Sequence, residues 1–247
     1  MPELRVFHRV DSTNDAARRL AETGAPAGTV VIADEQTHGR GRRGRVWTTT
    51  PGAALLLSVV FRPPRGAPDP VLTLRLGLAV AQAIETATRL EVDMKWPNDL
   101  QVGGRKVAGL LCEASMERGR LPFLVAGVGI NVESSDDHWP PDVRARATSL
   151  AAAADPVPPM EDLAEHVIRE MLSATASGSQ RLTRLERERI EARDILAGRL
   201  VAVDGRPAGR VAGIADDGAL RVMAGTAERR VLGGVVRILN AEEAEAV

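Results

Sequence analysis

The sequence has one cysteine, no tyrosine and only 2% aromatic residues among its 247 positions. A single thiol excludes an intramolecular disulfide and a metal cluster built from cysteines, and it is typical of a protein kept in a reducing compartment. Cys112 ends the apolar run 107–112, which favours a buried small side chain over a nucleophile. We therefore expect a cytoplasmic protein in which Cys112 is a core residue.

Long apolar runs are also missing. No stretch approaches the roughly 20 apolar residues of a membrane span, and the first five residues lack the charged-then-apolar order of a signal peptide. The composition is 44% hydrophobic, so a core can form, and the length fits one large domain or a large and a small one. We expect no membrane partner.

Charge and histidine spacing argue against two further classes of function. The formal net charge is −1, whereas a dedicated nucleic-acid binder usually carries a strong basic excess, so no nucleic-acid partner is expected. Histidines are too scattered for the ligand spacing of a zinc site. They are His8, His38, His138 and His166.

Lysine is nearly absent, because only Lys95 and Lys106 stand among 32 basic residues. Both lie in one short stretch, 94–109. An ammonium is a compact point charge, whereas a guanidinium is a broad planar fork. Retaining lysine only here indicates a tight pocket where a small cation meets a phosphate or carboxylate, although two remaining lysines could also fall together by chance.

Hydrophobic periodicity and turn residues predict an alternation of strands and helices. Ser12 or Thr13 could cap the first helix, and Asp15 has the spacing of a capping box. We expect helices over 11–24, 71–90, 160–175 and 180–197, strands over 28–36, 53–61, 92–96, 107–114 and 122–132, and an irregular crossover over 133–159.

The C-terminal part has a different texture. Five short strands separated by tight turns are expected between residues 200 and 239, which is typical of a small β-barrel. We place a boundary near Ala197, with domains at 1–197 and 198–247.

A glycine- and arginine-rich loop, 39–45, contains the literal pattern G-x-G-x-x-G. A dinucleotide fingerprint needs a helix directly after it, and residues 45–52 are β-branched and turn-like instead. A phosphate-binding P-loop is excluded because no Gly-Lys-Ser/Thr follows a glycine-rich run. We expect a loop that closes over an anion. A solvated basic loop or a nucleic-acid patch are the alternatives, and one flanking aromatic, Trp47, disfavours the latter.

Four segments in order, 11–14, 36–47, 95–113 and 127–132, closely resemble the biotin–protein ligases, and the resemblance spans about residues 8–240. It implies that biotin and Mg-ATP give biotinyl-5′-adenylate and pyrophosphate. The adenylate then acylates a lysine of the biotin carboxyl carrier domain of a carboxylase of the acetyl-CoA carboxylase type. The implied fold is α/β of the α+β type: a mixed sheet flanked by helices, similar to class II aminoacyl-tRNA synthetases, followed by a small SH3-like β-barrel.

The resemblance also implies roles for individual residues. Arg42 and Lys106 are expected to be catalytic, by neutralising the reacting carboxylate and α-phosphate. Asp99 either orients a lysine or meets Mg²⁺. Helix capping and core packing remain alternative roles for Ser12 and Trp47. Biotin contacts are expected from Ser12, Thr13, Asn14, Gln36, Gly39, Arg40, Gly41, Lys106, Gly109 and Gly127, and ATP or adenylate contacts from Arg42, Trp47, Lys95 and Asn131.

Some members of the family carry an N-terminal DNA-binding domain and repress transcription. Here the ligase motifs begin by residue 11, so we expect neither that domain nor repressor activity. A lipoate- or octanoyl-transferring relative, a non-catalytic biotin sensor and a nucleic-acid module are the alternatives. The loop 39–45 and the motif 95–99 disfavour the first, and the intact set of cations disfavours the second. No signal in the sequence fixes an oligomeric state.

Overall fold

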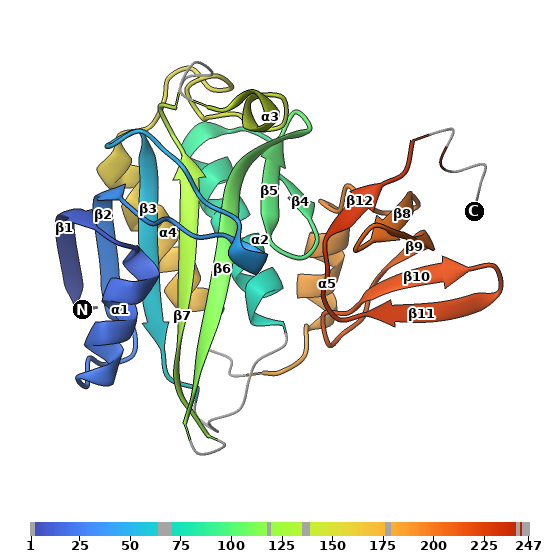
Figure 1. The fold of residues 1–247 in the computed structure, drawn as a ribbon, viewed down its shortest axis with the longest axis horizontal. Coiled ribbons are helices and arrows are strands. Elements are labelled where there is room, and N and C mark those ends of the chain that lie inside the picture. Colours follow the sequence, from blue (N-terminus) through green and yellow to red (C-terminus); the bar gives the residue numbers. More distant parts are fainter. Residues whose placement is uncertain are drawn as a thin grey trace.

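A seven-stranded mixed sheet forms the centre of the protein in the computed structural model, which describes residues 3–63, 71–117, 120–134, 139–175, 179–240 and 243 (Figure 1). The strands lie in the order β1-β2-β3-β7-β6-β5-β4. β1 runs parallel to β2, and the other neighbouring pairs are antiparallel. The bounds are β1 Leu4–Val10, β2 Val30–Gln36, β3 Ala54–Phe61, β4 Asp93–Lys95, β5 Asp99–Val102, β6 Arg105–Glu117 and β7 Arg120–Asn131.

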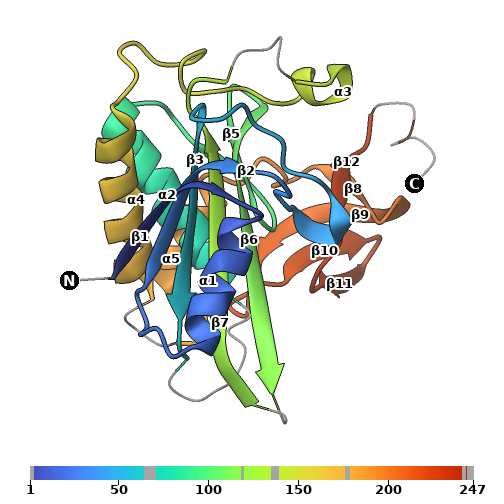
Figure 2. The same ribbon diagram turned by 60° about the vertical axis from the view of Figure 1, so that its left-hand side comes forward.

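Helices cover both faces of this sheet (Figures 1 and 2). α1 (Thr13–Glu22) packs on β2, β3 and β7 at one face, through small residues such as Ala17 and Ala21. α2 (Leu72–Thr88) and α4 (Met160–Ala174) pack together on the other face, where the larger hydrophobic core lies. No helix in the described part of the chain is long and apolar enough to cross a membrane.

Side-chain alternation along β7 leaves a hollow on the α1 face. Phe123 and Val125 pack against α1, but the next two positions on the same face are Gly127 and Gly129. The even-numbered residues 124–130 belong to the main core on the opposite face. Because successive side chains of a strand point to opposite faces, the two glycines leave this part of the α1 face without side chains. They form the floor of a pocket.

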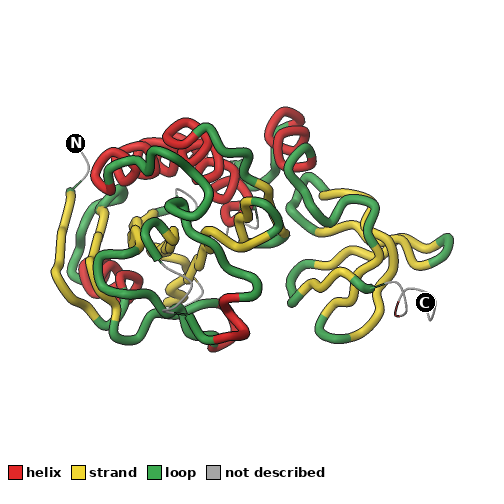
Figure 3. The backbone as a smooth tube through the Cα atoms, turned by 90° about the horizontal axis from the view of Figure 1, so that it is seen from above, coloured by secondary structure: helices red, strands yellow, loops and turns green. Residues whose placement is uncertain are grey.

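The C-terminal part forms a second, antiparallel sheet in the order β11-β10-β9-β8-β12, which lies beside the first (Figures 1 and 3). The short helix α5 (Arg184–Glu191), with a capping box between Thr183 and Glu186, precedes it and contacts β9. Trp96 Nε1 donates to Gly218 O at 2.9 Å and joins the two parts. The bounds are β8 Leu200–Val203, β9 Arg206–Ile214, β10 Leu220–Ala224, β11 Ala227–Val231 and β12 Val236–Ile238.

Most expected elements are present, with shifted ends. The helix expected over 180–197 is much shorter, because the chain turns after Glu191 and Asp194 bridges to Met94 of β4. The expected crossover over 133–159 contains a short helix, α3 (Pro141–Arg144), within its described residues. The five expected C-terminal strands are all found.

One prediction from sequence was wrong, and two strands were missed. Ser12 occupies the N-cap position of α1 but makes no side-chain capping bond, and Asp15 pairs with Arg40 instead of completing a capping box. β1 was missed because this edge strand is exposed on both faces and lacks alternation. β5 was missed because it is short, although a tight turn at Gly103–Gly104, both with positive φ, joins it to β6.

Candidate functional site

A cavity of about 430 Å³ lies on the α1 face of the large sheet. The N-terminus of α1 and strands β3, β6 and β7 form its base and one end. The hairpin 39–47 crosses over it, and segments 95–99, 139–147 and 234–236 close its other sides. Fourteen predicted site residues line it: Ser12, Thr13, Asn14, Gln36, Arg40, Gly41, Arg42, Trp47, Lys95, Asp99, Lys106, Gly109, Gly127 and Asn131.

Gly39 is the predicted residue that does not line the cavity. It closes the base of the hairpin, where Trp47 N donates to Gly39 O at 2.9 Å. A Cβ at position 39 would overlap the Trp47 carbonyl oxygen and lie 3.1 Å from Gln36 Nε2. Gly41 N donates to Arg45 O at 2.7 Å one step further along. The segment expected to be a loop is therefore a closed hairpin, and Gly39 shapes it.

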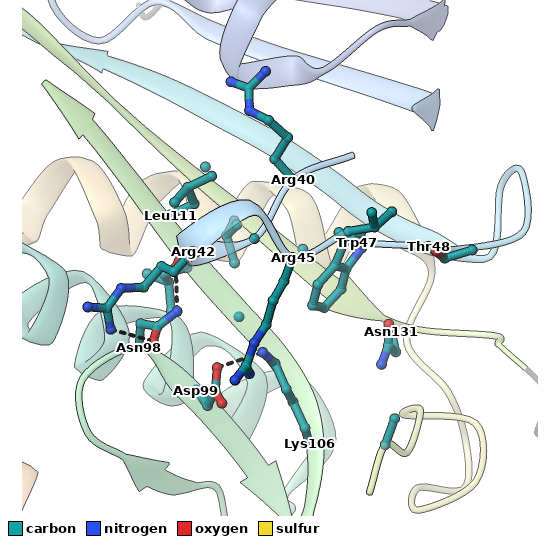
Figure 4. Close-up of a pocket in the computed structure, with 18 of the residues that line it drawn as sticks. Arg40, Arg42, Arg45, Trp47, Thr48, Asn98, Asp99, Lys106, Leu111 and Asn131 are labelled. Carbon is teal, nitrogen blue, oxygen red and sulfur yellow. Dashed lines mark hydrogen bonds and ion pairs between the residues drawn. The ribbon is translucent and has the colours of Figure 1, made fainter. Parts of the chain in front are cut away.

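The arginines of the hairpin point to different places (Figure 4). Arg40 pairs with Asp15 and with Glu113, whose Oε2 lies 3.0 Å from its Nη2, so its side chain is turned away from the cavity. These two carboxylates raise the pKa of Arg40 above its ordinary value, with the bond to Asp15 the larger cause. The Arg40 side chain thus fastens the hairpin to α1 and β6.

Arg42 enters the cavity and donates from Nη1 to Asn98 Oδ1 at 3.2 Å (Figure 4). Asn98 is itself fixed to β6, because its Nδ2 donates to Leu110 O at 2.8 Å. Burial lowers the pKa of Arg42, and the neighbouring Arg43 contributes in the same direction. Arg45 extends toward Lys106 and Asp99 (Figure 4). Two guanidinium groups of the hairpin therefore line the cavity, one at Asn98 and one at the Lys106–Asp99 pair.

Lys106 and Asp99 form the central ion pair of the site, with Nζ 2.6 Å from Oδ1. The ammonium also lies 5.5 Å from the centre of the Trp47 ring, within the range of a cation–π contact. A Cβ at Gly109 would lie 2.9 Å from Lys106 Nζ and 3.3 Å from Trp47 Cζ3. Gly109 therefore makes room for these two side chains. Of the two roles left open for Asp99, this contact supports that of orienting a lysine.

Lys95 is half-buried beside this pair, and no described residue forms a hydrogen bond or ion pair with its ammonium. The pKa of Lys95 lies below its ordinary value, chiefly because of burial. Asp99 acts in the opposite direction, and Lys106 lowers the pKa further. Asp99 is the sole carboxylate among the described lining residues, which include Lys95, Lys106 and Arg146 as well as the arginines of the hairpin. The cavity is thus strongly cationic and suited to a polyanionic ligand.

The opposite end of the cavity is polar and neutral. Gln36 Oε1 accepts from Thr13 N at 2.7 Å and from Thr13 Oγ1 at 3.0 Å. Among the described residues none accepts a bond from Gln36 Nε2, which makes this group a candidate donor to a ligand. Asn14 Nδ2 donates to Glu113 Oε2 at 2.7 Å and to Leu111 O at 3.2 Å. Asn14 thus orders the wall, and Gln36 is the freer donor.

Gly127 makes room for Asn14. A Cβ at position 127 would overlap Asn14 Oδ1 and lie 3.2 Å from Ser58 Oγ. Ser58 is fully buried on β3, and its Oγ lies 2.7 Å from Asn14 Oδ1 and 2.8 Å from Thr13 Oγ1. The predicted close approach at Gly127 is therefore, in the first place, to these protein side chains.

Two residues predicted on the nucleotide side are held differently. Asn131 is buried, and its Nδ2 donates to Thr148 O at 3.0 Å, which fastens the crossover to β7. The Trp47 ring packs on Gly129, and its Nε1 is buried without a hydrogen-bond partner among the described residues. An unpaired buried N–H is costly, so this atom is a candidate donor to a ligand.

A resident metal site does not fit the residues described. No group of three His, Cys, Asp or Glu side chains comes together among them, and Asp99 is already paired with Lys106. His138 lies outside the described residues.

Several site residues escaped sequence reasoning. Ser58 is the one polar residue inside the apolar strand 54–61, and that interruption was a usable signal. Asn98, Arg45 and Glu113 belong to motifs that the sequence displayed, yet no role could be given to them. Arg146 comes from the crossover, where nothing marked it.

Comparison with known proteins gives a consistent result. Residues 6–131 match the biotin/lipoate A/B protein ligase family. The bifunctional ligase/repressor BirA of Bacillus spizizenii is 41% identical over 146 residues, 59% of this chain and 45% of the relative. The biotin–[acetyl-CoA-carboxylase] ligase of Mycobacterium tuberculosis is 36% identical over 178 residues, 68% and 62% of the two chains. The chain thus spans about half to three fifths of these relatives.

Solved structures resemble the whole chain. The biotin protein ligase of Aquifex aeolicus in complex with biotin and ATP superposes with a TM-score of 0.83 at 28% identity, covering 97% of this chain and 100% of that one. The biotin protein ligase of Leishmania major in complex with biotinyl-5-AMP gives 0.66 at 26% identity, covering 98% and 100%.

Proposed function

Because the chain belongs to the biotin/lipoate A/B protein ligase family, we propose that it is a cytoplasmic biotin–protein ligase. It activates biotin with ATP and transfers it to one lysine of a biotin carboxyl carrier domain. The 1–197 part is the catalytic domain, related to class II aminoacyl-tRNA synthetases, and the 198–247 part is SH3-like. Named relatives that are biotin ligases, and a neighbour solved with biotin and ATP, support this proposal.

One observation carries the proposal: a single cavity joins a neutral polar end to a cationic end. Thr13 and Gln36 stand at the first, whereas Arg42, Lys95 and Lys106 stand at the second. Biotin has a polar, uncharged ureido ring at one end and a carboxylate at the other. ATP brings a triphosphate. Such a pair of substrates needs both kinds of surface in one place.

In the first step, Gln36 Nε2 donates to the ureido carbonyl and the biotin carboxylate lies at Lys106. The carboxylate is ionised at neutral pH, so no general base is required. Its oxygen bonds to the α-phosphorus of ATP while the bond from that phosphorus to the bridging oxygen breaks, and pyrophosphate leaves. Lys106 and Arg42 offset the repulsion of the two anions, and one such donor is worth roughly 10²–10³ in rate.

Mg²⁺ enters this proposal as part of the substrate Mg-ATP. Magnesium at such sites takes most of its ligands from phosphate oxygens and water, which agrees with the lack of a carboxylate cluster among the described residues. The chain's own contribution to the phosphates is then its cations.

In the second step, the carrier lysine amine attacks the acyl carbon, the bond to the phosphate oxygen breaks, AMP leaves and the amine proton passes to solvent. Until the carrier arrives, the mixed anhydride must be shielded from water. The hairpin 39–47, anchored by Arg40 at its base, covers the cavity and supplies that shield.

The direct test is a mass measurement. The protein is incubated with ATP, Mg²⁺, biotin and a carrier domain, and the carrier is weighed with and without its target lysine. A gain equal to biotin minus water, confined to the carrier with its lysine, is expected. Tight biotin binding without any gain would identify a sensor instead. A gain from octanoate or lipoate but not from biotin would identify a lipoate-type enzyme.

A further inference from the structure

Arg43 stands at the tip of the hairpin 39–47 in a left-handed backbone conformation, with φ 57 and ψ 39. This conformation is uncommon for a residue with a Cβ, so the contacts around it must hold it. Neighbouring arginines then reach different parts of the molecule. Arg42 donates to Asn98 inside the cavity, and Arg43 forms a two-pronged ion pair with Asp204 of the C-terminal sheet.

Asp204 is a rigid partner. It forms the tight turn between β8 and β9 with Gly205, and both have positive φ, at 51 and 78. Its Oδ1 accepts from Val235 N at 2.8 Å, and its own N–H donates to Val235 O at 3.0 Å. These backbone contacts fix the Asp204 carboxylate independently of Arg43. The bond to Arg43 is the largest cause that holds the pKa of Asp204 below its ordinary value.

The segment that fixes Asp204 also borders the cavity. Gly234 and Val235 are among its lining residues. A Cβ at Gly233 would lie 4.0 Å from Arg42 Nη2, so this backbone runs beside the catalytic guanidinium. Figure 2 shows the turn of the hairpin next to the C-terminal strands. The C-terminal sheet thus touches both the tip of the hairpin and the side of the reaction site.

We propose that Arg43 is a positioning residue, and that its pair with Asp204 makes the C-terminal sheet a latch that holds the hairpin closed over biotinyl-5′-adenylate. The inference rests on the proposed ligase function and deepens it. Arg40 fastens the base of the hairpin to α1 and β6, and Arg43 fastens the tip, 161 residues away in sequence from its partner. Arg42 and Arg45, on either side of Arg43, keep their side chains at the cavity.

The strength of the latch matches its task. The two side chains are 50% and 45% exposed, and an exposed ion pair contributes little and is screened by salt. A strong bond would trap the hairpin, which must open to admit biotin and ATP and to release pyrophosphate. A weak one shifts the balance between open and closed forms by a small factor, which is enough to change how long the adenylate stays bound.

The test measures the rate at which pre-formed biotinyl-5′-adenylate leaves the protein, using labelled biotin and a chase of unlabelled adenylate. The variants are Arg43→Gln, Asp204→Asn and both together. Asn keeps the acceptor for Val235 N–H and tolerates the left-handed turn. Arg43→Lys keeps the charge. Arg181→Gln is the control, since Arg181 forms an exposed ion pair at 2.8 Å with Asp216, which lies between β9 and β10 of the same sheet, and neither residue lines the cavity.

We expect each single variant to release the adenylate about two to five times faster, and the double variant no faster than either. Arg43→Lys should release the adenylate almost as slowly as the wild type, and Arg181→Gln should behave as the wild type. Raising the salt to about 0.5 M speeds release by a larger factor from the wild type than from Arg43→Gln, which keeps only the salt dependence of the ligand contacts.

Three outcomes overturn the latch. Additive effects of the two substitutions would mean that they do not act through one pair. Faster release of the adenylate from Arg43→Gln but not from Asp204→Asn would make Arg43 a direct ligand contact. An equal acceleration of release in Arg181→Gln would mean that losing any exposed ion pair near this sheet loosens the protein. A wild type that forms no adenylate at all would overturn the proposed function itself, and the latch with it.

Discussion

Lys106 and Asp99 face each other across the β5–β6 hairpin, with Lys106 Nζ 2.6 Å from Asp99 Oδ1. The pair sits under the Trp47 ring and beside the ammonium of Lys95. Lys106 is thus oriented by a carboxylate, whereas Lys95 is half-buried and has no hydrogen-bond or ion-pair partner among the described residues. These are the only two lysines of the sequence, and both line the cationic wall of the cavity.

Lys106→Arg is expected to fold normally and to lose most adenylate formation. A guanidinium is broader than an ammonium, and Lys106 Nζ is confined between Trp47 and the backbone at Gly109. The rate of biotin-dependent pyrophosphate release should fall about 10²-fold or more. Arg105→Lys, one position earlier and outside the lining set, is the matched control. Near-normal adenylation by Lys106→Arg would contradict a requirement for a compact cation.

Asp99→Asn separates orientation from charge. The amide oxygen can still accept from Lys106 but no longer as a charged partner, so the ammonium is held less firmly. The loss should be about 1.5 kcal/mol, or roughly tenfold in kcat. Removing the sole carboxylate described in the cavity wall should leave the KM for ATP unchanged or lower. A large rise in that KM with unchanged kcat would instead favour a metal or nucleotide role for Asp99.

Gly127→Ala should weaken both the fold and biotin binding. The added methyl group would overlap Asn14 Oδ1 on the floor of the polar end. Overpacking of this kind costs about 1–3 kcal/mol, which thermal unfolding and biotin titration would measure. Gly41→Ala is the matched control for thermal unfolding, because its Cβ would make ordinary contacts at 3.6 Å. Equal behaviour of the two variants would show that Asn14 moves aside freely.

Asp194→Asn should stabilise the protein at neutral pH. Burial raises the pKa of Asp194 from 3.8 to about 6, and its Oδ2 has no partner among the described residues. A carboxyl whose pKa is raised by folding destabilises the fold above that value and not below its unfolded pKa. The gain should be about 3 kcal/mol above pH 6 and vanish by pH 4. Denaturant unfolding at both pH values measures it, and a gain independent of pH would exclude ionisation as the cause.

Sequence patterns located the fold and most of the site because their information is local. Alternating strands, the long apolar helix and the five C-terminal strands follow from periodicity and turn residues. The motifs 36–47 and 95–109, which can be read directly from the sequence, likewise supply many of the residues that line the cavity. Resemblance to a family supplied their roles, and the structure supplied their distances.

What the sequence could not reveal depends on contacts between distant residues. Asp15 has the spacing of a helix cap, yet the guanidinium of Arg40 competes for it and prevails. Arg40, Arg42 and Arg43 are the same residue type within one short motif. Their different positions become clear only from their partners in space, which are Asp15, Asn98 and Asp204. Pairings over such separations have no local pattern.

The most direct test of the central claim is a single-turnover measurement without any carrier domain. Protein, Mg-ATP and biotin are mixed, and pyrophosphate and biotinyl-5′-adenylate are counted per site. One cavity that holds both substrates predicts a burst of about one equivalent of each, dependent on biotin and lost in Lys106→Arg. Saturable biotin binding with no biotin-dependent pyrophosphate release would contradict it.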